Sequence, residues 1–267
     1  MRLRLVAALP VPLAAAAVLL LVAGAGWPSD QSAAWRLEGV AVKALAALGA
    51  AAAAFAFGPR SRLRTAWAAV AVAYAFLAAK TFPVVGDDLL SARLGTLAAN
   101  LLAPLGSFLM VRAWYGAGLT PAIPLVRRWA LPALTLAVAL AVAGPSLVAE
   151  VRSMGHDPSA TLLVFSWLGD IASITMLAPF LLIALAMRGG RLAWPWGLLA
   201  AGQLCWLLYD LVPSLAPGLV SSVDGVRALA EVMRSSACLL HAAAGVAQAL
   251  VLGPAPAADH HAAPGPR

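Results

Sequence analysis

Six side chains recur along the last apolar segment of the sequence at spacings of three or four residues. They are Glu231, Arg234, Cys238, His241, Gly245 and Gln248. This spacing places all six on one face of an α-helix. Glu231 and Arg234 lie one turn apart, where a carboxylate and a guanidinium can pair, and the imidazole of His241 has the chemistry of a general base. Such a polar face is costly in lipid, so we expect it to face other helices.

Further ionisable groups fall inside or beside apolar segments and gather toward one end of these segments. The whole set comprises Lys43, Lys80, Glu150, Asp170, Asp210, Glu231 and Arg234. Charged groups within a membrane usually face the interior of a bundle or a water-filled cavity, so we predict a polar pocket that opens outward. Its candidate ligand-binding residues are Lys80, Asp170, Gln203, Asp210, Glu231, Arg234 and His241. The alternative is that pairs such as Lys80 with Asp210 only join helices.

A metal site is a weaker hypothesis. Cys238 and His241 lie three residues apart on the predicted helix, but no second spaced pair of ligands accompanies them. Asp259, His260 and His261 near the end of the chain offer only weak chelation. We therefore expect no metal and no other cofactor, and we assign no catalytic residue.

The candidate residues lie in or beside long apolar runs of the sequence, and these runs must form the elements that position them. Of 267 residues, 63% are hydrophobic and 11% are charged, whereas a soluble domain has roughly 25% charged residues. Runs long enough to cross a hydrocarbon core lie near residues 5–24, 38–57, 66–85, 94–113, 130–149, 162–186, 194–213 and 229–252. Because they do not alternate as barrel strands do, we predict an all-α polytopic membrane helical bundle with about eight transmembrane helices. It forms a single domain over residues 1–252, and a disordered cytoplasmic tail over 253–267 follows it.

The first run permits a second interpretation. A basic start, an apolar stretch and the small residues Ala23-Gly24-Ala25-Gly26 are also typical of a cleaved signal peptide, whose removal would leave seven spans. The stretch is long for a signal peptide and contains Pro10 and Pro12, which favours a retained span.

Arginines cluster in the loops on one side of the predicted bundle. These are Arg2, Arg4, Arg60, Arg62, Arg64, Arg112, Arg127, Arg128, Arg188 and Arg191. By the positive-inside rule this side is cytoplasmic, so both termini are cytoplasmic, and the lipid bilayer is the expected partner of the protein. A net charge of +7 that is divided among short clusters gives no binding face for nucleic acid. Tryptophans near the ends of the runs, including Trp67, Trp114, Trp129 and Trp196, are expected to anchor the spans at the interfaces.

Two of the runs share a pattern. Arg93-Leu94-Gly95 begins a segment that contains Ala103-Pro104, and Trp167-Leu168-Gly169 begins a segment that contains Ala178-Pro179. The pattern predicts four helical hairpin repeats, with a proline kink at the same depth in the fourth and sixth spans. The alternative is that spans rich in Ala and Leu resemble one another by composition alone.

The stretch over residues 160–252 resembles the multi-span membrane sensory modules of bacterial diguanylate cyclases, phosphodiesterases and histidine kinases. The features that carry the resemblance are Trp167-Leu168-Gly169-Asp170, Pro179, Arg188-Gly-Gly-Arg191, Trp194-Pro195-Trp196, Trp206 and Tyr209-Asp210-Leu211. The resemblance implies an outward-facing sensor for a small molecule in the cytoplasmic (inner) membrane of a bacterium. This chain departs from the family in having no output domain after the last span, so a signalling partner protein is expected.

Three classes of function remain open at this point. The leading hypothesis is a sensory or ligand-binding module with an unknown small-molecule ligand. A small transporter is the alternative, because Pro104, Pro132, Pro145 and Pro179 can break helices as alternating access requires. An enzyme acting on lipid-linked substrates is a second alternative, with Asp170 or His241 as the base, although no known catalytic motif of membrane enzymes occurs in the sequence.

Overall fold

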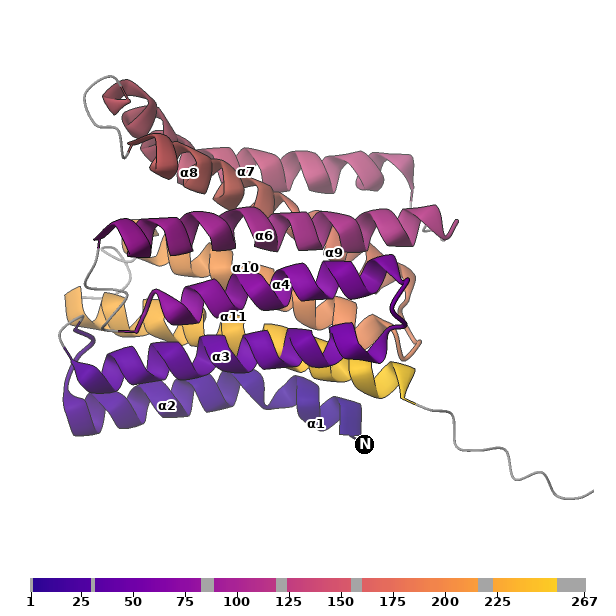
Figure 1. Ribbon diagram of the computed structural model, residues 1–267, viewed down its shortest axis with the longest axis horizontal. Helices are drawn as coiled ribbons and strands as arrows, with labels where there is room; N and C mark the ends of the chain where they lie inside the picture. Colours follow the sequence, from indigo (N-terminus) through magenta and orange to yellow (C-terminus); the bar gives the residue numbers. More distant parts are fainter. Residues whose placement is uncertain are drawn as a thin grey trace, which may run out of the picture.

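The computed structural model describes residues 2–29, 32–82, 89–118, 124–154, 160–215 and 223–253, and all regular structure within them is α-helical. The helices are α1 (Arg2–Ala8), α2 (Pro10–Ala25), α3 (Ala33–Ala56), α4 (Arg62–Ala79), α6 (Leu89–Gly116), α7 (Leu125–Ser153), α8 (Ala160–Thr175), α9 (Leu177–Ala186), α10 (Ala193–Leu215) and α11 (Val223–Leu252). They run along a common direction as one bundle (Figure 1). The predicted all-α architecture is therefore confirmed for these residues.

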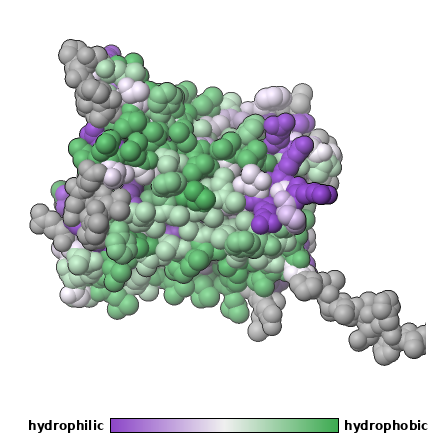
Figure 2. Space-filling model, viewed as in Figure 1, coloured by the Kyte–Doolittle hydropathy of each residue, from purple (hydrophilic) through white to green (hydrophobic). Residues whose placement is uncertain are grey.

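Five helical segments are long and apolar enough to cross a membrane: Ala33–Ala56, Leu89–Gly116, Arg128–Ser153, Ala160–Ala186 and Val223–Leu252. A sixth apolar helix, Pro10–Ala25, is shorter. The face in Figure 2 is hydrophobic over most of the length of the bundle, and hydrophilic side chains gather at one end. Since lipid offers no partners for backbone polar groups, a helix that satisfies its own backbone suits such a surface. The chain is thus a multi-pass membrane protein.

Several turns of the chain meet at one end of the bundle (Figure 1). This end holds the start of α1, the end of α11, the turn from α3 to α4 and the turn from α9 to α10. Two arginine groups lie in these turns, and we call the end that carries Arg60, Arg62, Arg64, Arg188 and Arg191 the arginine-rich end. The guanidinium of Arg191 lies 3.5 Å from the carbonyl oxygen of Leu250, which ties the α9–α10 turn to the last turn of α11.

Glycines allow α3 and α11 to pack closely. A Cβ atom on Gly49 would lie 2.6 Å from the Cα atom of Ala242, and a Cβ atom on Gly245 would overlap the carbonyl group of Gly49. Small residues at such crossings let membrane helices approach until their backbones touch. The face of α11 that is predicted to be polar therefore meets α3, and its members Cys238, His241 and Gln248 are all buried, as predicted.

The sixth run is interrupted for one residue at Met176, between α8 and α9, although Met176 still donates to Ala172 and accepts from Phe180 as in a helix. Pro179 explains the position, because a proline cannot donate to the carbonyl four residues before it and its ring crowds that carbonyl, here that of Thr175. The hydroxyl of Thr135 on α7 lies 3.4 Å from the freed oxygen and 3.1 Å from the carbonyl oxygen of Pro132 in its own helix, so its single proton is shared between the two acceptors. In contrast, α6 continues as one helix through Pro104. The two Ala-Pro pairs thus have different local outcomes, and the hairpin repeat stays a prediction.

Tryptophans near helix ends differ in their surroundings. Trp129 on α7 is 69% exposed, as an interfacial anchor would be. Trp67, Trp114 and Trp196 are instead buried in the largest hydrophobic cluster, where the rings of Trp114 and Trp196 meet edge to face at 5.9 Å between centroids. For these three residues the expectation of an anchor in the interfacial belt was wrong, since their rings pack between helices.

Candidate functional site

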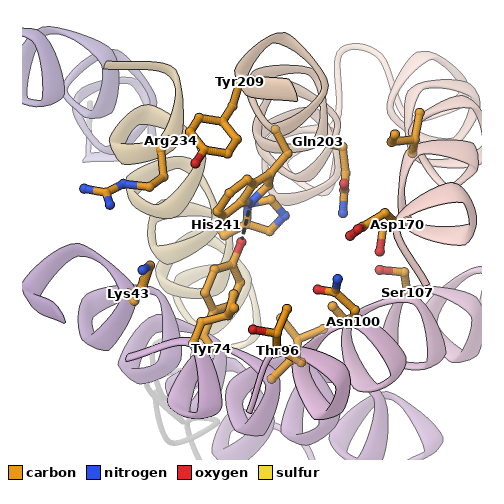
Figure 3. A pocket seen from close by; sticks show the side chains of 18 of the residues that line it. Lys43, Tyr74, Thr96, Asn100, Ser107, Asp170, Gln203, Tyr209, Arg234 and His241 are labelled. Carbon is orange, nitrogen blue, oxygen red and sulfur yellow. Dashed lines mark hydrogen bonds between the residues drawn. The ribbon is translucent and has the colours of Figure 1, made fainter. Parts of the chain in front are cut away.

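A cavity of about 250 Å³ lies between α3, α4, α6, α8, α10 and α11 (Figure 3). Its polar and aromatic lining consists of Lys43, Tyr74, Lys80, Thr96, Asn100, Ser107, Asp170, Ser173, Gln203, Trp206, Tyr209, Asp210, Arg234 and His241. Apolar side chains such as Met110 and Leu199 complete the lining. A concave site with a few convergent polar groups is the usual form of a small-molecule site.

Most of the residues singled out from the sequence meet in this cavity. Six of the candidates line it, namely Lys80, Asp170, Gln203, Asp210, Arg234 and His241. Glu231 does not line it but forms an ion pair with Arg234 at 2.5 Å, as the one-turn spacing predicts. The alternative pairing of Lys80 with Asp210 is absent from the described ion pairs. Lys80 instead lies near enough to Asp170 for their charges to attract each other.

Arg234 is held by two carboxylates behind the cavity wall. Its guanidinium donates to Glu38 on α3 and to Glu231 on its own helix. The hydroxyl of Ser235 donates to the other oxygen of Glu38. Because the side chains of Arg234 and Glu38 are only 13% and 9% exposed, this group is a desolvated ion triad that joins α3 to α11.

The two lysines of the cavity are each bound by a threonine. The ammonium of Lys43 donates to Thr81 at 2.7 Å, and that of Lys80 donates to Thr96 at 2.8 Å. Each threonine hydroxyl in turn donates to the carbonyl four residues earlier in its helix, which fixes the position of the oxygen that accepts from lysine. Lys43 is only 6% exposed, yet it forms no ion pair with any described residue.

Four rings form a connected aromatic group beside these charges. The indole of Trp206 donates to the phenol oxygen of Tyr74 at 3.0 Å and meets the ring of Tyr209 edge to face at 5.7 Å. Tyr74 also packs against His241, with 5.4 Å between ring centroids. Figure 3 shows Tyr74, Tyr209 and His241 around the open space, with Lys43 and Arg234 on one side and Asp170 on the other.

His241 is fixed in one orientation. Its Nδ1 atom lies 2.8 Å from the carbonyl oxygen of Ala237. A carbonyl can only accept, so Nδ1 carries the proton, and in the neutral ring Nε2 is left as an acceptor. The ring also fills the space beside Gly202 on α10, because a Cβ atom at Gly202 would overlap it.

Comparison with known proteins identifies no relative of this chain. No family model, no curated protein and no solved structure matches the chain. The function must therefore be argued from the cavity itself.

The two amides of the cavity differ in their hydrogen bonding. Asn100 donates to the hydroxyl of Ser166 at 2.8 Å and so links α6 to α8. At this contact the helices touch, because a Cβ atom on Gly169 would overlap the carbonyl group of Asn100. Gln203 on α10 is only 7% exposed and forms no hydrogen bond with any residue that the structure describes. Its amide points into the cavity in Figure 3.

The weak metal candidates gain no further ligand. Cys238 is completely buried, and His241 uses Nδ1 for a backbone carbonyl. Within the described ranges no three side chains of His, Cys, Asp or Glu are grouped as a metal site requires. Asp259, His260 and His261 lie outside the described residues.

Sequence reasoning missed Tyr74, Thr96 and the role of Glu38. Tyr74 occurs in an apolar run with no polar residue at helical spacing to mark it. Glu38 is visible as a carboxylate near the start of the second run, but its partner Arg234 is 196 residues away. A contact at that separation leaves no pattern in a single sequence.

Proposed function

We propose that this chain is an eight-span protein of the bacterial inner membrane with both termini in the cytoplasm. The spans beyond the five long apolar helices are the pair α1 and α2, then α4 and α10. The arginine-rich end supports the orientation, because it gathers the basic turns at the end of the bundle where α1 starts and α11 ends.

We propose further that the protein binds a small molecule in the cavity, as a sensory or ligand-binding module that passes its signal to a partner protein. The observation that carries this proposal is the gathering of ionisable groups around open space within an apolar bundle. Ion pairs that only join helices would leave no open space around their charges, and the carboxylate of Glu38 indeed contacts Arg234 directly. The charged lining from Lys43 to Asp210 lies toward the end opposite the arginine-rich end, so the cavity faces outward in this orientation.

Accessibility of single cysteines tests the proposal. The background replaces Cys205 and Cys238 by alanine, and Ala103→Cys places a thiol in the cavity while Arg62→Cys places one at the arginine-rich end. A small membrane-impermeant thiol reagent added to spheroplasts should modify Ala103→Cys directly and Arg62→Cys only after permeabilisation. Reversal of this pattern would overturn the orientation, and an Ala103→Cys thiol that never reacts would overturn the open cavity.

One observation favours a transporter as the second candidate. Ser173 and Ile174 line the cavity immediately before the break at Met176, and broken helices at a midplane site are typical of transporters. Transport also requires a path to the cytoplasm. Thiols at Gln203 and Gln248 that become accessible alternately from the two sides would favour transport, whereas access to Gln203→Cys from outside alone would favour ligand binding.

A further inference from the structure

Positive charges around the cavity are already balanced. Arg234 pairs with Glu38 and Glu231, and Lys43, which donates to Thr81, lies near enough to Glu231 for their charges to attract each other, so these two cations are matched by two anions. Of the other charged lining residues, Lys80 attracts Asp170. One negative charge then remains on this side of the cavity. A ligand that restores balance carries a positive charge.

Asp170 and Asp210 are the groups that lack donors. Asp170 comes from α8 and Asp210 from α10, and both side chains line the cavity. Neither carboxylate receives a hydrogen bond or forms an ion pair within the described part of the chain. In contrast, the three cations of the lining all donate to a threonine or a carboxylate. Asp170 and Asp210 therefore lack a hydrogen-bond donor among the described residues, and a positively charged donor would suit both carboxylates.

Two residues of the aromatic group share α10 with Asp210. Tyr209 is the neighbour of Asp210 in the chain, and Trp206 is one turn before Asp210 on α10. The rings of Trp206, Tyr209 and Tyr74 all line the same cavity. Aromatic walls next to an acid favour an organic cation, because they attract its charge and cover its carbon atoms.

Two buried polar side chains mark the deeper part of the cavity as a binding surface. Gln203 and Ser107 are 7% and 3% exposed, and neither hydrogen-bonds to a described residue. Their polar groups line the cavity without a described protein partner, so a ligand or water in the cavity can bond to them. This observation is independent of the aspartates and also indicates an occupant.

We infer that the cavity binds a small organic ammonium ion, with its charged group between Asp170 and Asp210 and its apolar body against Tyr74, Trp206 and Tyr209. The inference rests on the proposed ligand-binding function and adds the chemical class of the ligand. The positive charge distinguishes this ligand from a carboxylate or phosphate, which Asp170 and Asp210 would repel and for which the lining cations already donate to Thr81, Thr96 or Glu38.

Matched probes test the charge. Thermal unfolding of the purified full-length chain in detergent is followed with butylamine, butan-1-ol or butyrate, and then with choline or its neutral isostere 3,3-dimethylbutan-1-ol, at constant ionic strength. The cations should raise the melting temperature in a saturable way, because a ligand that binds only the folded state stabilises it. The neutral and anionic probes should leave the melting temperature unchanged.

Asp210→Asn and Asp170→Asn connect the effect to the site. Each should weaken the apparent affinity for butylamine by roughly ten- to a hundredfold, the loss expected for one charge-assisted hydrogen bond. Asp224→Asn is the matched control, since Asp224 is exposed in the first turn of α11 and does not line the cavity. If Asp170→Asn fails to fold, Asp210→Asn carries the test, because Asp210 is exposed and forms no hydrogen bond or ion pair with a described residue.

Three results would overturn the inference: equal stabilisation by the neutral isosteres, stabilisation by butyrate alone, or no saturable effect of any cation. Each of these three results can be distinguished from a failure of the proposed ligand-binding function. If the thiol of Ala103→Cys is reached from outside while the cations have no selective effect, the open cavity stands and the ligand class is wrong. If that thiol is unreachable, the proposed function itself fails.

Discussion

The indole of Trp206 donates a hydrogen bond of 3.0 Å to the hydroxyl of Tyr74, although 132 residues separate the two in the chain. The contact joins α10 to α4 across the cavity. Tyr74 is 4% exposed, so neither group can exchange its partner freely for bulk water. The bond therefore fixes the distance between two walls of the site as well as the orientation of both rings.

Tyr74→Phe tests this contact. Removal of the acceptor leaves the indole N–H without a protein partner, and we expect the free energy of unfolding to fall by about 1–3 kcal/mol. Unfolding by SDS in mixed micelles measures the change. Tyr115→Phe near the end of α6 is the matched control and should have little effect, because the ring that faces Arg128 is kept. Equal losses in the two variants would show that the hydrogen bond contributes nothing specific.

The ion triad predicts an order of severity. Arg234→Met leaves Glu38 and Glu231 without their shared cation, and we expect a loss of about 3–5 kcal/mol, the usual cost of a buried charge that loses its partner. Glu38→Gln should cost less, because Arg234 keeps Glu231. The exposed Arg227→Met on the same helix controls for loss of positive charge. The triad would be unimportant for stability if Arg234→Met were as stable as Arg227→Met.

Close packing of α3 and α11 predicts opposite effects of one substitution at two glycines. A methyl group at Gly245 would overlap the backbone of Gly49, so Gly245→Ala should destabilise the fold by about 1–3 kcal/mol. Gly197→Ala in α10 meets no atom within 4 Å and should be neutral or stabilise by up to about 1 kcal/mol. The thermal midpoints of the two variants provide the measurement. If the midpoint of Gly245→Ala is unchanged, the helices do not cross as closely as described.

Helical periodicity explains why the face of α11 was predictable. The spacing from Arg234 to Gln248 is local, and burial of that face follows from its polarity in an apolar helix. Contacts between helices were not predictable in the same way. The pairing of Glu38 with Arg234 depends on how α3 and α11 pack, and a single sequence does not record this packing.

The effect of a proline on its own helix was also not predictable from the sequence alone. Pro104 and Pro179 each follow an alanine in an apolar run, and both were expected to kink their helices. The run with Pro179 is interrupted at Met176, next to the carbonyl of Thr175, which the proline leaves free and which lies 3.4 Å from the hydroxyl of Thr135 on α7. In α6 the helix continues through Pro104. The proline alone therefore does not determine whether its helix is interrupted.

The two amides of the cavity give the sharpest contrast between folding and binding. Asn100 donates to Ser166 and supports the contact of α6 with α8, so Asn100→Leu should lower the melting temperature of the unliganded protein. Gln203 is equally a cavity residue, but no described residue bonds to its buried amide. Gln203→Met keeps the length of the side chain and removes the unsatisfied polar group. We therefore expect its unliganded melting temperature to rise.

The same variant should respond less to ligand. If Gln203 is maintained for an occupant of the cavity, Gln203→Met loses part of the stabilisation that butylamine gives to the unsubstituted chain, so stability and binding change in opposite directions. Thermal unfolding with and without butylamine measures both quantities on one sample. A lower unliganded melting temperature would show that the amide has a structural partner. An unchanged response to butylamine would show that the amide does not take part in binding.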